Sequence, residues 1–157
     1  MKQFKFIFAS LMAMLTLTIL PSCSDEKDEP AAPAARTIQG SYSGDMECSV
    51  MGSASTFENL TFSIDATDDA TVTVTLPAFG EAPMAMPSIA VAGVKVSEAD
   101  GVVTLATTEV SGQTESGKNY SCTLSGSVTD NVLSIKFNLQ YGAMPMPMIC
   151  SSTATKK

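Results

Sequence analysis

The sequence predicts an all-β protein, an antiparallel up-and-down barrel of about eight strands, preceded by an export signal. Three observations lead to this fold class. Apolar residues recur at every second position through most of the chain after residue 36, which is the period of a half-buried strand. Short stretches rich in Asp, Asn, Ser and Gly separate these segments at regular spacing, as turns do. The 3.6-residue period of an amphipathic helix is not found.

The first predicted strand, residues 37–50, shows the alternation most clearly. Its even-numbered positions are apolar or glycine, whereas its odd-numbered positions are all polar. A strand of this kind buries one face and exposes the other to water. Gly40 and Gly44 lie on the apolar face, where the missing side chain permits bending or close packing.

The following strands repeat the pattern over shorter stretches. Residues 60–64 and 71–76 each place apolar side chains on one face, with a polar turn between them. Residues 88–96 continue the alternation but change phase at Ala92 and Gly93. Such a shift predicts a β-bulge or a tight turn within the strand.

The second half of the chain supplies the remaining strands. They are expected at residues 102–110, 120–128 and 133–141 and in the final segment 144–154. Short turns join consecutive strands, and each strand has one polar face. We therefore prefer a meander that closes into a barrel over a sandwich.

Residues 1–22 are expected to be a lipoprotein signal peptide. Lys2 and Lys5 precede an apolar run over residues 6–20, which is too short to span a bilayer and typical of a secretory signal. The sequence "LPSC" that ends it resembles a lipobox, in which Cys23 would be lipidated and would begin the mature chain. Pro21 departs from the commonest form of that motif. The alternative is an ordinary signal peptide with a chance cysteine.

Residues 23–36 are expected to form a tether outside the folded domain. The stretch "SDEKDE" is strongly hydrated and cannot pack, and "PAAPAAR" favours an extended, semi-rigid conformation. An acidic patch with a lysine after the acylated cysteine resembles the signal that exports Bacteroidetes lipoproteins to the cell surface. A merely solvated spacer is the alternative.

Charge limits the classes of partner that the folded domain, residues 37–157, can bind together with its tether. The chain has 9 basic and 16 acidic residues, and without the two lysines of the signal its net charge is −9. This balance disfavours nucleic acid and anionic membrane surfaces as partners. The expected contact with a membrane is therefore the lipid anchor.

Three segments together carry a resemblance to a known family. They are "IQGSYSGDMECSVMG", "TVTVTLPAFG" followed by a Met-Pro stretch and "SIAVAGVKV", and "NVLSIKFNLQYGAMPMPMI". In this order, from residue 37 to about residue 153, they resemble the calycin-like domain of Bacteroidetes lipoproteins. The resemblance implies a lipocalin-like barrel at the outer membrane, exposed at the cell surface. It implies no particular ligand.

The cysteines suggest one disulfide. With Cys23 lipidated, Cys48, Cys122 and Cys150 remain, each at an inward position of its predicted strand. The first and last strands of a closed meander are neighbours, so Cys48 and Cys150 are the best candidates for a disulfide in an oxidising compartment. The alternative is three buried thiols. A catalytic cysteine is not expected, because the chain has no histidine to activate one.

Two methionine-proline stretches, residues 81–89 and 142–150, echo each other. A proline has no backbone N–H, so prolines on the same side of a strand leave that side without hydrogen-bond donors for the neighbouring strand. We therefore expect both stretches at an edge or at the closing contact of the barrel. Their methionines could be core and mouth packing, an adaptable apolar ligand surface, or a thioether site for Cu(I). The candidate ligand-facing residues are Met84, Met86, Met144, Met146, Met148, Tyr42, Tyr120 and Tyr141.

The acidic residues do not point to an enzyme. Clusters at 65–69 and 98–101 could hold calcium but also match ordinary turn chemistry. Neither a glycosidase pair nor a nucleotide or nucleophile motif stands out, so no catalytic residue, cofactor or metal is assigned. The expected function is a surface-anchored, non-enzymatic binding module for a small apolar ligand or a protein. The alternative is a structural, inhibitory or protein-interaction barrel, accessory to outer-membrane complexes.

Overall fold

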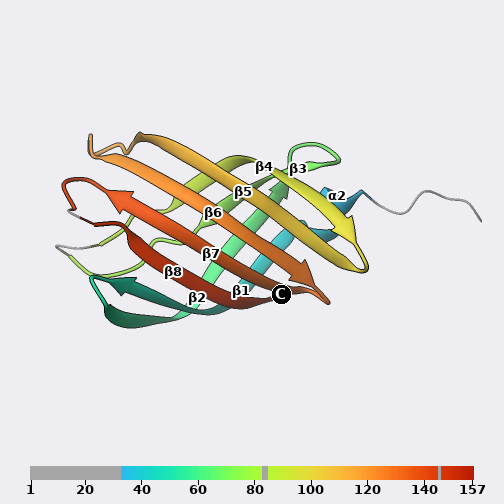
Figure 1. Ribbon diagram of the computed structural model, residues 1–157, viewed down its shortest axis with the longest axis horizontal. Helices are drawn as coiled ribbons and strands as arrows, with labels where there is room; N and C mark the ends of the chain where they lie inside the picture. The colour runs from blue at the N-terminus through green and yellow to red at the C-terminus, as the bar shows by residue number, and fades with distance from the viewer. Residues whose placement is uncertain (1–32, 83–84, 145) are drawn as a thin grey trace, which may run out of the picture. The chain divides into compact units, whose positions relative to one another are not determined.

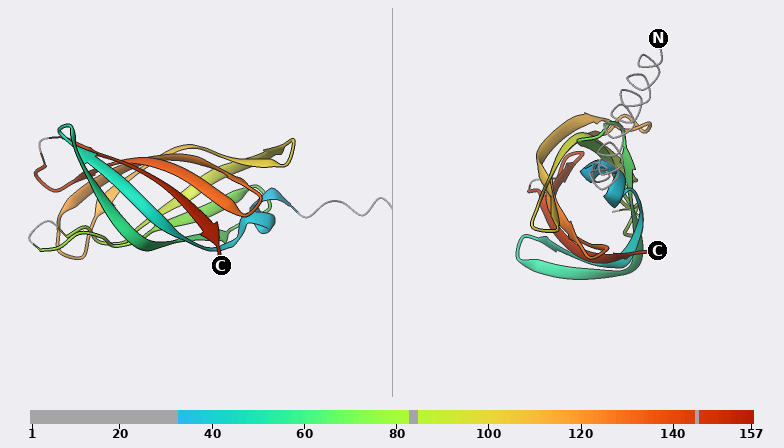
Figure 2. Two further views of the ribbon diagram at one scale, coloured as in Figure 1. Left: turned by 90° about the horizontal axis from the view of Figure 1, so that it is seen from below. Right: turned by 90° about the vertical axis from the view of Figure 1, so that its right-hand side faces the viewer.

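The computed structural model describes residues 33–82, 85–144 and 146–157. Eight strands follow one another in sequence order, each pairs antiparallel with the next, and the last pairs with the first to close a barrel. Figure 1 shows the strands from the side, and the end-on view in Figure 2 shows them closing around an interior. The predicted all-β, up-and-down barrel of about eight strands is confirmed. In the described part of the chain, no helix is long and apolar enough to cross a membrane.

One short helix precedes the eight strands in the described part of the chain. They are α2 (Ala34–Ile38), β1 (Gly40–Val50), β2 (Ser53–Ala66), β3 (Thr71–Leu76), β4 (Ile89–Ala99), β5 (Val102–Gln113), β6 (Asn119–Thr129), β7 (Val132–Tyr141) and β8 (Met148–Lys156). The prediction that the first strand begins at residue 37 is wrong, because residues 34–38 form a short helix. One buried residue, Ile38, fits a strand and a helix equally well, so the alternation could not reveal this boundary.

The barrel has two dissimilar ends. The helix end carries α2, the turns that join β2 to β3, β4 to β5 and β6 to β7, and the end of β8. The loop end carries the turn from β1 to β2 and the connections from β3 to β4, β5 to β6 and β7 to β8. In Figure 1 the helix end is on the right and the loop end on the left. The three longest connections thus gather opposite the helix.

Large side chains fill the interior. Tyr42, Phe62 and Phe137 are buried, as are most inward methionines, leucines, isoleucines and valines. The outward positions between them are mostly polar, as the alternation predicts, and Ile149 is an apolar exception. Each fully buried large apolar side chain stabilises the fold by about 1.5–3 kcal/mol relative to exposure, so this core drives the closure of the barrel.

Two features predicted for single positions are confirmed. The register between β3 and β4 shifts between Val72 and Val74, which places an extra residue at Ala92 and Gly93 as a bulge. Gly44 allows close packing, since a methyl group there would come within 2.8 Å of the Cα of Ala154 on β8. The missing side chain therefore lets β1 and β8 approach each other.

The second methionine-proline stretch is not a strand along its whole length. Gly142 takes a left-handed backbone conformation directly after β7, and the Met144 N–H donates to the Tyr141 carbonyl, so the chain turns there. β8 begins only at Met148. The prediction of a one-sided strand over 144–148 is therefore wrong. The closing contact is also well formed, because β1 and β8 stay in register from Tyr42 and Lys156 to Ser49 and Ile149.

Candidate binding pocket at the loop end

An apolar cavity opens at the loop end of the barrel. It lies between β1, β2, β8 and the connection from β3 to β4, and its volume is about 310 Å³. We call it the mouth pocket. Its apolar lining consists of Val50, Phe57, Phe79, Met86 and Met148. This volume is at the lower limit of small-molecule pockets, which suits a compact ligand.

Two aromatic rings and a backbone bridge shape one wall of the mouth pocket. The rings of Phe57 and Phe79 lie 5.1 Å apart at a tilt of 59°, a geometry that aromatic pairs favour. Phe79 and Met86 exchange backbone hydrogen bonds of 3.1 Å and 2.8 Å. This bridge closes the connection from β3 to β4 on itself, and the contact between the Phe79 and Phe57 rings joins that connection to β2.

A disulfide lies beside the mouth pocket, which Cys48 lines. Cys48 of β1 and Cys150 of β8 face each other in the register, with Cα atoms 4.1 Å apart, and their sulfurs are bonded. This is the pair that the strand order favours. Because 102 residues separate the two cysteines, the bond removes much freedom from the unfolded chain. It therefore holds the first and last strands together beside the pocket.

The polar groups of the mouth pocket are few. Ser53 and Ser55 supply hydroxyls, and Glu81 supplies a carboxylate, all from exposed residues at the rim. A pocket of this composition accommodates an apolar body and can accept hydrogen bonds from a donor or cationic group near the opening. It has no nucleophile or acid–base pair among its lining residues.

The family follows from the fold and from a sequence match. A model of the calycin-like beta-barrel domain matches residues 38–151. The chain belongs to this calycin-like family. The matched range agrees with the resemblance found between residue 37 and about residue 153.

A solved structure resembles the calycin-like barrel. It is the 2.40 Å crystal structure of a candidate outer membrane protein from Bacteroides fragilis NCTC 9343, with a TM-score of 0.69 and 23% sequence identity. The match covers 80% of this chain but 54% of the other, so this chain spans about half the length of that protein. At this identity the likeness shows the fold alone. Among curated proteins, no match is found.

The predicted methionines separate into different environments of the calycin-like barrel. Met86 and Met148 are buried and lie together at the mouth pocket. Met144 is half-buried against the core, whereas 49% of Met146 is exposed. The prediction that Met146 shares an inward face with Met148 is wrong, because the turn after β7 interrupts the strand. Met84 lies outside the described residues, as do Cys23 and the whole signal peptide.

The three predicted tyrosines are also dispersed. Tyr42 is buried near the helix end, where its hydroxyl donates to the Ile38 carbonyl at 2.7 Å, so it belongs to the core and not to a pocket. Tyr141 is buried, and the Lys118 ammonium lies 5.3 Å from its ring centroid. Tyr120 is half-buried and lines a separate cleft near β4 and β5.

Sequence reasoning missed the two phenylalanines of the mouth pocket. Phe79 lies between strands, where alternation says nothing about burial, and Phe57 lies in the part of β2 before the predicted segment 60–64. The available signal was the stretch "PAFG" directly before the first Met-Pro segment. An aromatic residue in a connection that is rich in methionine and proline indicates that the connection packs onto the barrel.

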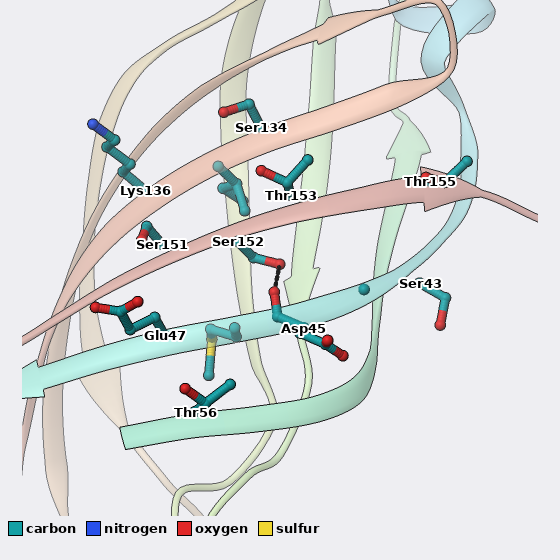
Figure 3. A pocket seen from close by; sticks show the side chains of 13 residues that line it. Ser43, Asp45, Glu47, Thr56, Ser134, Lys136, Ser151, Ser152, Thr153 and Thr155 are labelled. Carbon is teal, nitrogen blue, oxygen red and sulfur yellow. Dashed lines mark hydrogen bonds between the residues drawn. The ribbon is translucent and has the colours of Figure 1, made fainter. Parts of the chain in front are cut away.

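A polar groove lies on the outer face of β7, β8 and β1. It encloses about 620 Å³, and Figure 3 shows the serine and threonine side chains that line it together with Asp45, Glu47 and Lys136. The Ser152 hydroxyl donates to the backbone carbonyl of Asp45 at 2.7 Å. Water competes for every exposed hydrogen-bonding group here, so each bond to a ligand would add only about 0.5–1.5 kcal/mol. The mouth pocket is therefore the better candidate site.

The cysteine and carboxylate side chains that could carry chemistry have structural roles instead. Burial raises the pKa of the Cys122 thiol to about 11, so at neutral pH it stays protonated and is a poor nucleophile. The Ala70 N–H donates to Asp68 at 2.8 Å and lowers the pKa of that carboxyl, which is turn chemistry. Over residues 33–157 as described, no three cysteine or carboxylate side chains gather as a metal site would require.

Proposed function

We propose that this calycin-like chain is a lipoprotein anchored at the cell surface, where it acts as a non-enzymatic binding module for a small, largely apolar ligand. The observation that carries the proposal is the mouth pocket, a cavity of about 310 Å³ lined mainly by apolar side chains. Fold alone does not assign a function, so the argument rests on this site.

The energetics of the mouth pocket favour a weakly polar ligand. Burying roughly 200 Å² of apolar ligand surface would contribute about 5 kcal/mol before the entropic cost of association is subtracted. Glu81 at the rim would favour a ligand that carries a hydrogen-bond donor or a positive charge at one end. A strongly anionic ligand would meet repulsion from this carboxylate and from the acidic surface of the domain.

The position of the pocket suits an anchored protein. The described chain begins at Pro33, directly before α2 at the helix end. A tether from Cys23 would therefore join the folded domain at α2, on the side of the barrel that does not carry the mouth pocket. The lipobox-like sequence before Cys23 and the acidic tether support this location.

The chemistry of the side chains supports a binding role without catalysis. The chain contains no histidine, and the free thiol of Cys122 is buried with a raised pKa. General acid–base or nucleophilic catalysis requires a group poised to exchange protons near neutral pH, beside the reacting atoms. The mouth pocket contains one carboxylate at its rim and no partner for it.

Fluorescence of the neutral dye N-phenyl-1-naphthylamine tests the ligand site. The mature domain should enhance and blue-shift its emission, and Ser55→Trp should weaken binding at least tenfold because Ser55 lines the mouth pocket opposite Cys48. The matched control is Thr56→Trp, since Thr56 faces the polar groove on the other side of the same strand. Equal binding by both variants would place the dye elsewhere and contradict the proposal.

A second experiment tests the anchor. Expressed in a Bacteroides host, the full chain should partition with outer membranes and be cleaved by protease added to intact cells. Cys23→Ala should move the protein to the soluble fraction, because lipidation requires the thiol. Membrane association that survives this change would exclude Cys23 as the anchor.

A further inference from the structure

The barrel is not evenly paired around its circumference. β4 and β5 are in register from Ala99 and Val102 to Val96 and Leu105, close to the helix end. Towards the loop end, residues 89–95 of β4 pair with β3, and β5 pairs with β6 over residues 108–113, after a bulge at 106 and 107. Among the described residues these two segments are not paired with each other. Both strands thus have one open edge along this part of the barrel.

Two bulges lie where β4 and β5 separate. The bulge of β4 at Ala92 and Gly93 comes shortly before the last pair with β5, and that of β5 at Ala106 and Thr107 directly follows it. A bulge bends its strand and increases the local twist. The two together turn the edges away from each other. The separation of β4 from β5 therefore results from the backbone conformation of both strands and not from fraying at their ends.

A cleft lies at the loop end of the two open edges. It has a volume of about 520 Å³ and is lined by the start of β4, around Ser88 and Ala90, by Gln113 at the end of β5, and by residues 114–116 of the connection that follows. Tyr120 also lines it, and its hydroxyl lies where a side chain at Gly112 would be. An aromatic ring thus stands beside unpaired backbone in an exposed cleft.

We infer that the open edge of β5 receives an extended peptide segment of a partner protein as an added strand. Backbone N–H and C=O groups at a strand edge are complementary to another strand, and this kind of recognition is known for open sheet edges. The eight residues from 106 to 113 would span about 26 Å, which is longer than an average strand. The loop end leaves this edge accessible from solvent.

The side chains along β5 predict the sequence pattern of the partner. Val110 is half-buried and pairs with inward-facing Cys122, so alternate partner residues would face the interior and should be apolar. Glu109 is exposed on the opposite face, and Glu115 lines the cleft. The outward partner residues should therefore be basic. A second copy of this acidic chain is a poor occupant, because it would bring like charges together.

A binding experiment uses the mature domain and a short capped peptide of alternating valine and lysine. Fluorescence anisotropy should show binding that weakens with salt, and hydrogen exchange should show new protection within residues 106–113. The same peptide with alternate amides N-methylated along one edge should bind at least tenfold more weakly, because it loses the backbone bonds of that edge. Equal binding of the two peptides would overturn the inference.

Charge reversal supplies the matched pair of variants. Glu109→Lys should weaken peptide binding about tenfold, whereas Glu47→Lys, on a strand paired on both sides, should leave it unchanged. Both glutamates are exposed, so both variants should keep the unfolding midpoint of the parent. Sedimentation that shows a dimer paired through β5, or protection confined to other strands, would also overturn the inference.

Discussion

The two ends of this barrel are held together by different forces. At the helix end, α2 buries Ala35 and Ile38, and Tyr42 donates a hydrogen bond to the Ile38 carbonyl. Further hydrogen bonds tie the end of β8 to Thr37 and Ser41. At the loop end, pairing between β4 and β5 has stopped, and a disulfide joins β1 to β8. The helix end is closed by packing, and the loop end is restrained by a covalent bond.

This difference shows how a small barrel can keep an opening without losing its shape. A buried plug such as α2 would fill the mouth pocket, whereas the backbone pairs of β1 with β2 and β8 form its wall and leave it open. A disulfide restrains two strands and fills almost none of that space. The loop end can therefore retain a cavity and an open strand edge beside a well-packed core.

The largest expected effect comes from removing the restraint of the loop end. The double change Cys48→Ala with Cys150→Ala should lower the free energy of unfolding by about 2–5 kcal/mol, since the bond closes a long loop. Urea denaturation measures the loss, and the reduced parent protein should show a similar one. An unchanged midpoint would mean that the strands of the loop end do not depend on the disulfide.

The next largest effect is expected from glycine substitutions, whose cost in stability should differ between Gly44 and Gly112. Gly44→Ala should destabilise by about 1–3 kcal/mol, because its methyl group would meet the backbone of Thr153 and Ala154. Gly112→Ala near the loop end should be nearly neutral, since it meets only the movable Tyr120 side chain at 3.0 Å. Chemical denaturation of both variants provides the comparison. Equal losses would contradict the difference in packing.

A pair of tyrosine changes examines hydrogen bonding at each end. Tyr42→Phe should cost about 1–2 kcal/mol, because the Ile38 carbonyl loses its donor in a buried place. Tyr141→Phe should cost less than about 0.5 kcal/mol, since the ring that faces Lys118 is retained. Thermal unfolding at one pH measures both. A larger loss of stability in Tyr141→Phe than in Tyr42→Phe would mean that the loop end, and not the helix end, depends more on its tyrosine hydroxyl.

The effect that is smallest near neutral pH is a dependence of stability on alkaline pH. Burial raises the pKa of the Cys122 thiol to about 11 in the folded chain, above the ordinary value of 9.0. The folded state therefore favours the protonated thiol, and this contribution is complete below pH 9 and lost as the pH approaches 11. The slope of unfolding free energy against pH over this window should be smaller in Cys122→Ala than in the parent. Identical slopes would show that the thiol does not titrate differently on folding.

Most of the fold could be predicted because it depends on alternation, which the sequence displays directly. The disulfide partners also followed from strand order, since a closed meander places Cys48 beside Cys150. The short helix could not be predicted, because five residues with two buried positions do not establish a period. The methionine-proline stretch was misjudged because proline parity has meaning only within a strand, and Gly142 ends the strand first.

The candidate site was predicted only in part. Met86 and Met148 were identified from composition, but Phe57 and Phe79 become neighbours only through the folding of a connection. The separation of β4 from β5 was equally hidden, since each strand keeps its alternation whether or not it has a partner. The bulge predicted at Gly93 was the one local sign of it. The alternation along a strand indicates which of its faces is buried, but it gives no information on which of its edges are hydrogen-bonded.

The bond between Cys48 and Cys150 makes a covalent ring of the chain from β1 to β8. Every connection of the loop end lies inside this ring. A protease that cuts the connection between β5 and β6, around Ser116, would therefore leave both fragments attached through sulfur. The pieces would stay together on a non-reducing gel and would separate only after reduction. A nick in a connection of the loop end therefore leaves the two halves of the barrel covalently joined.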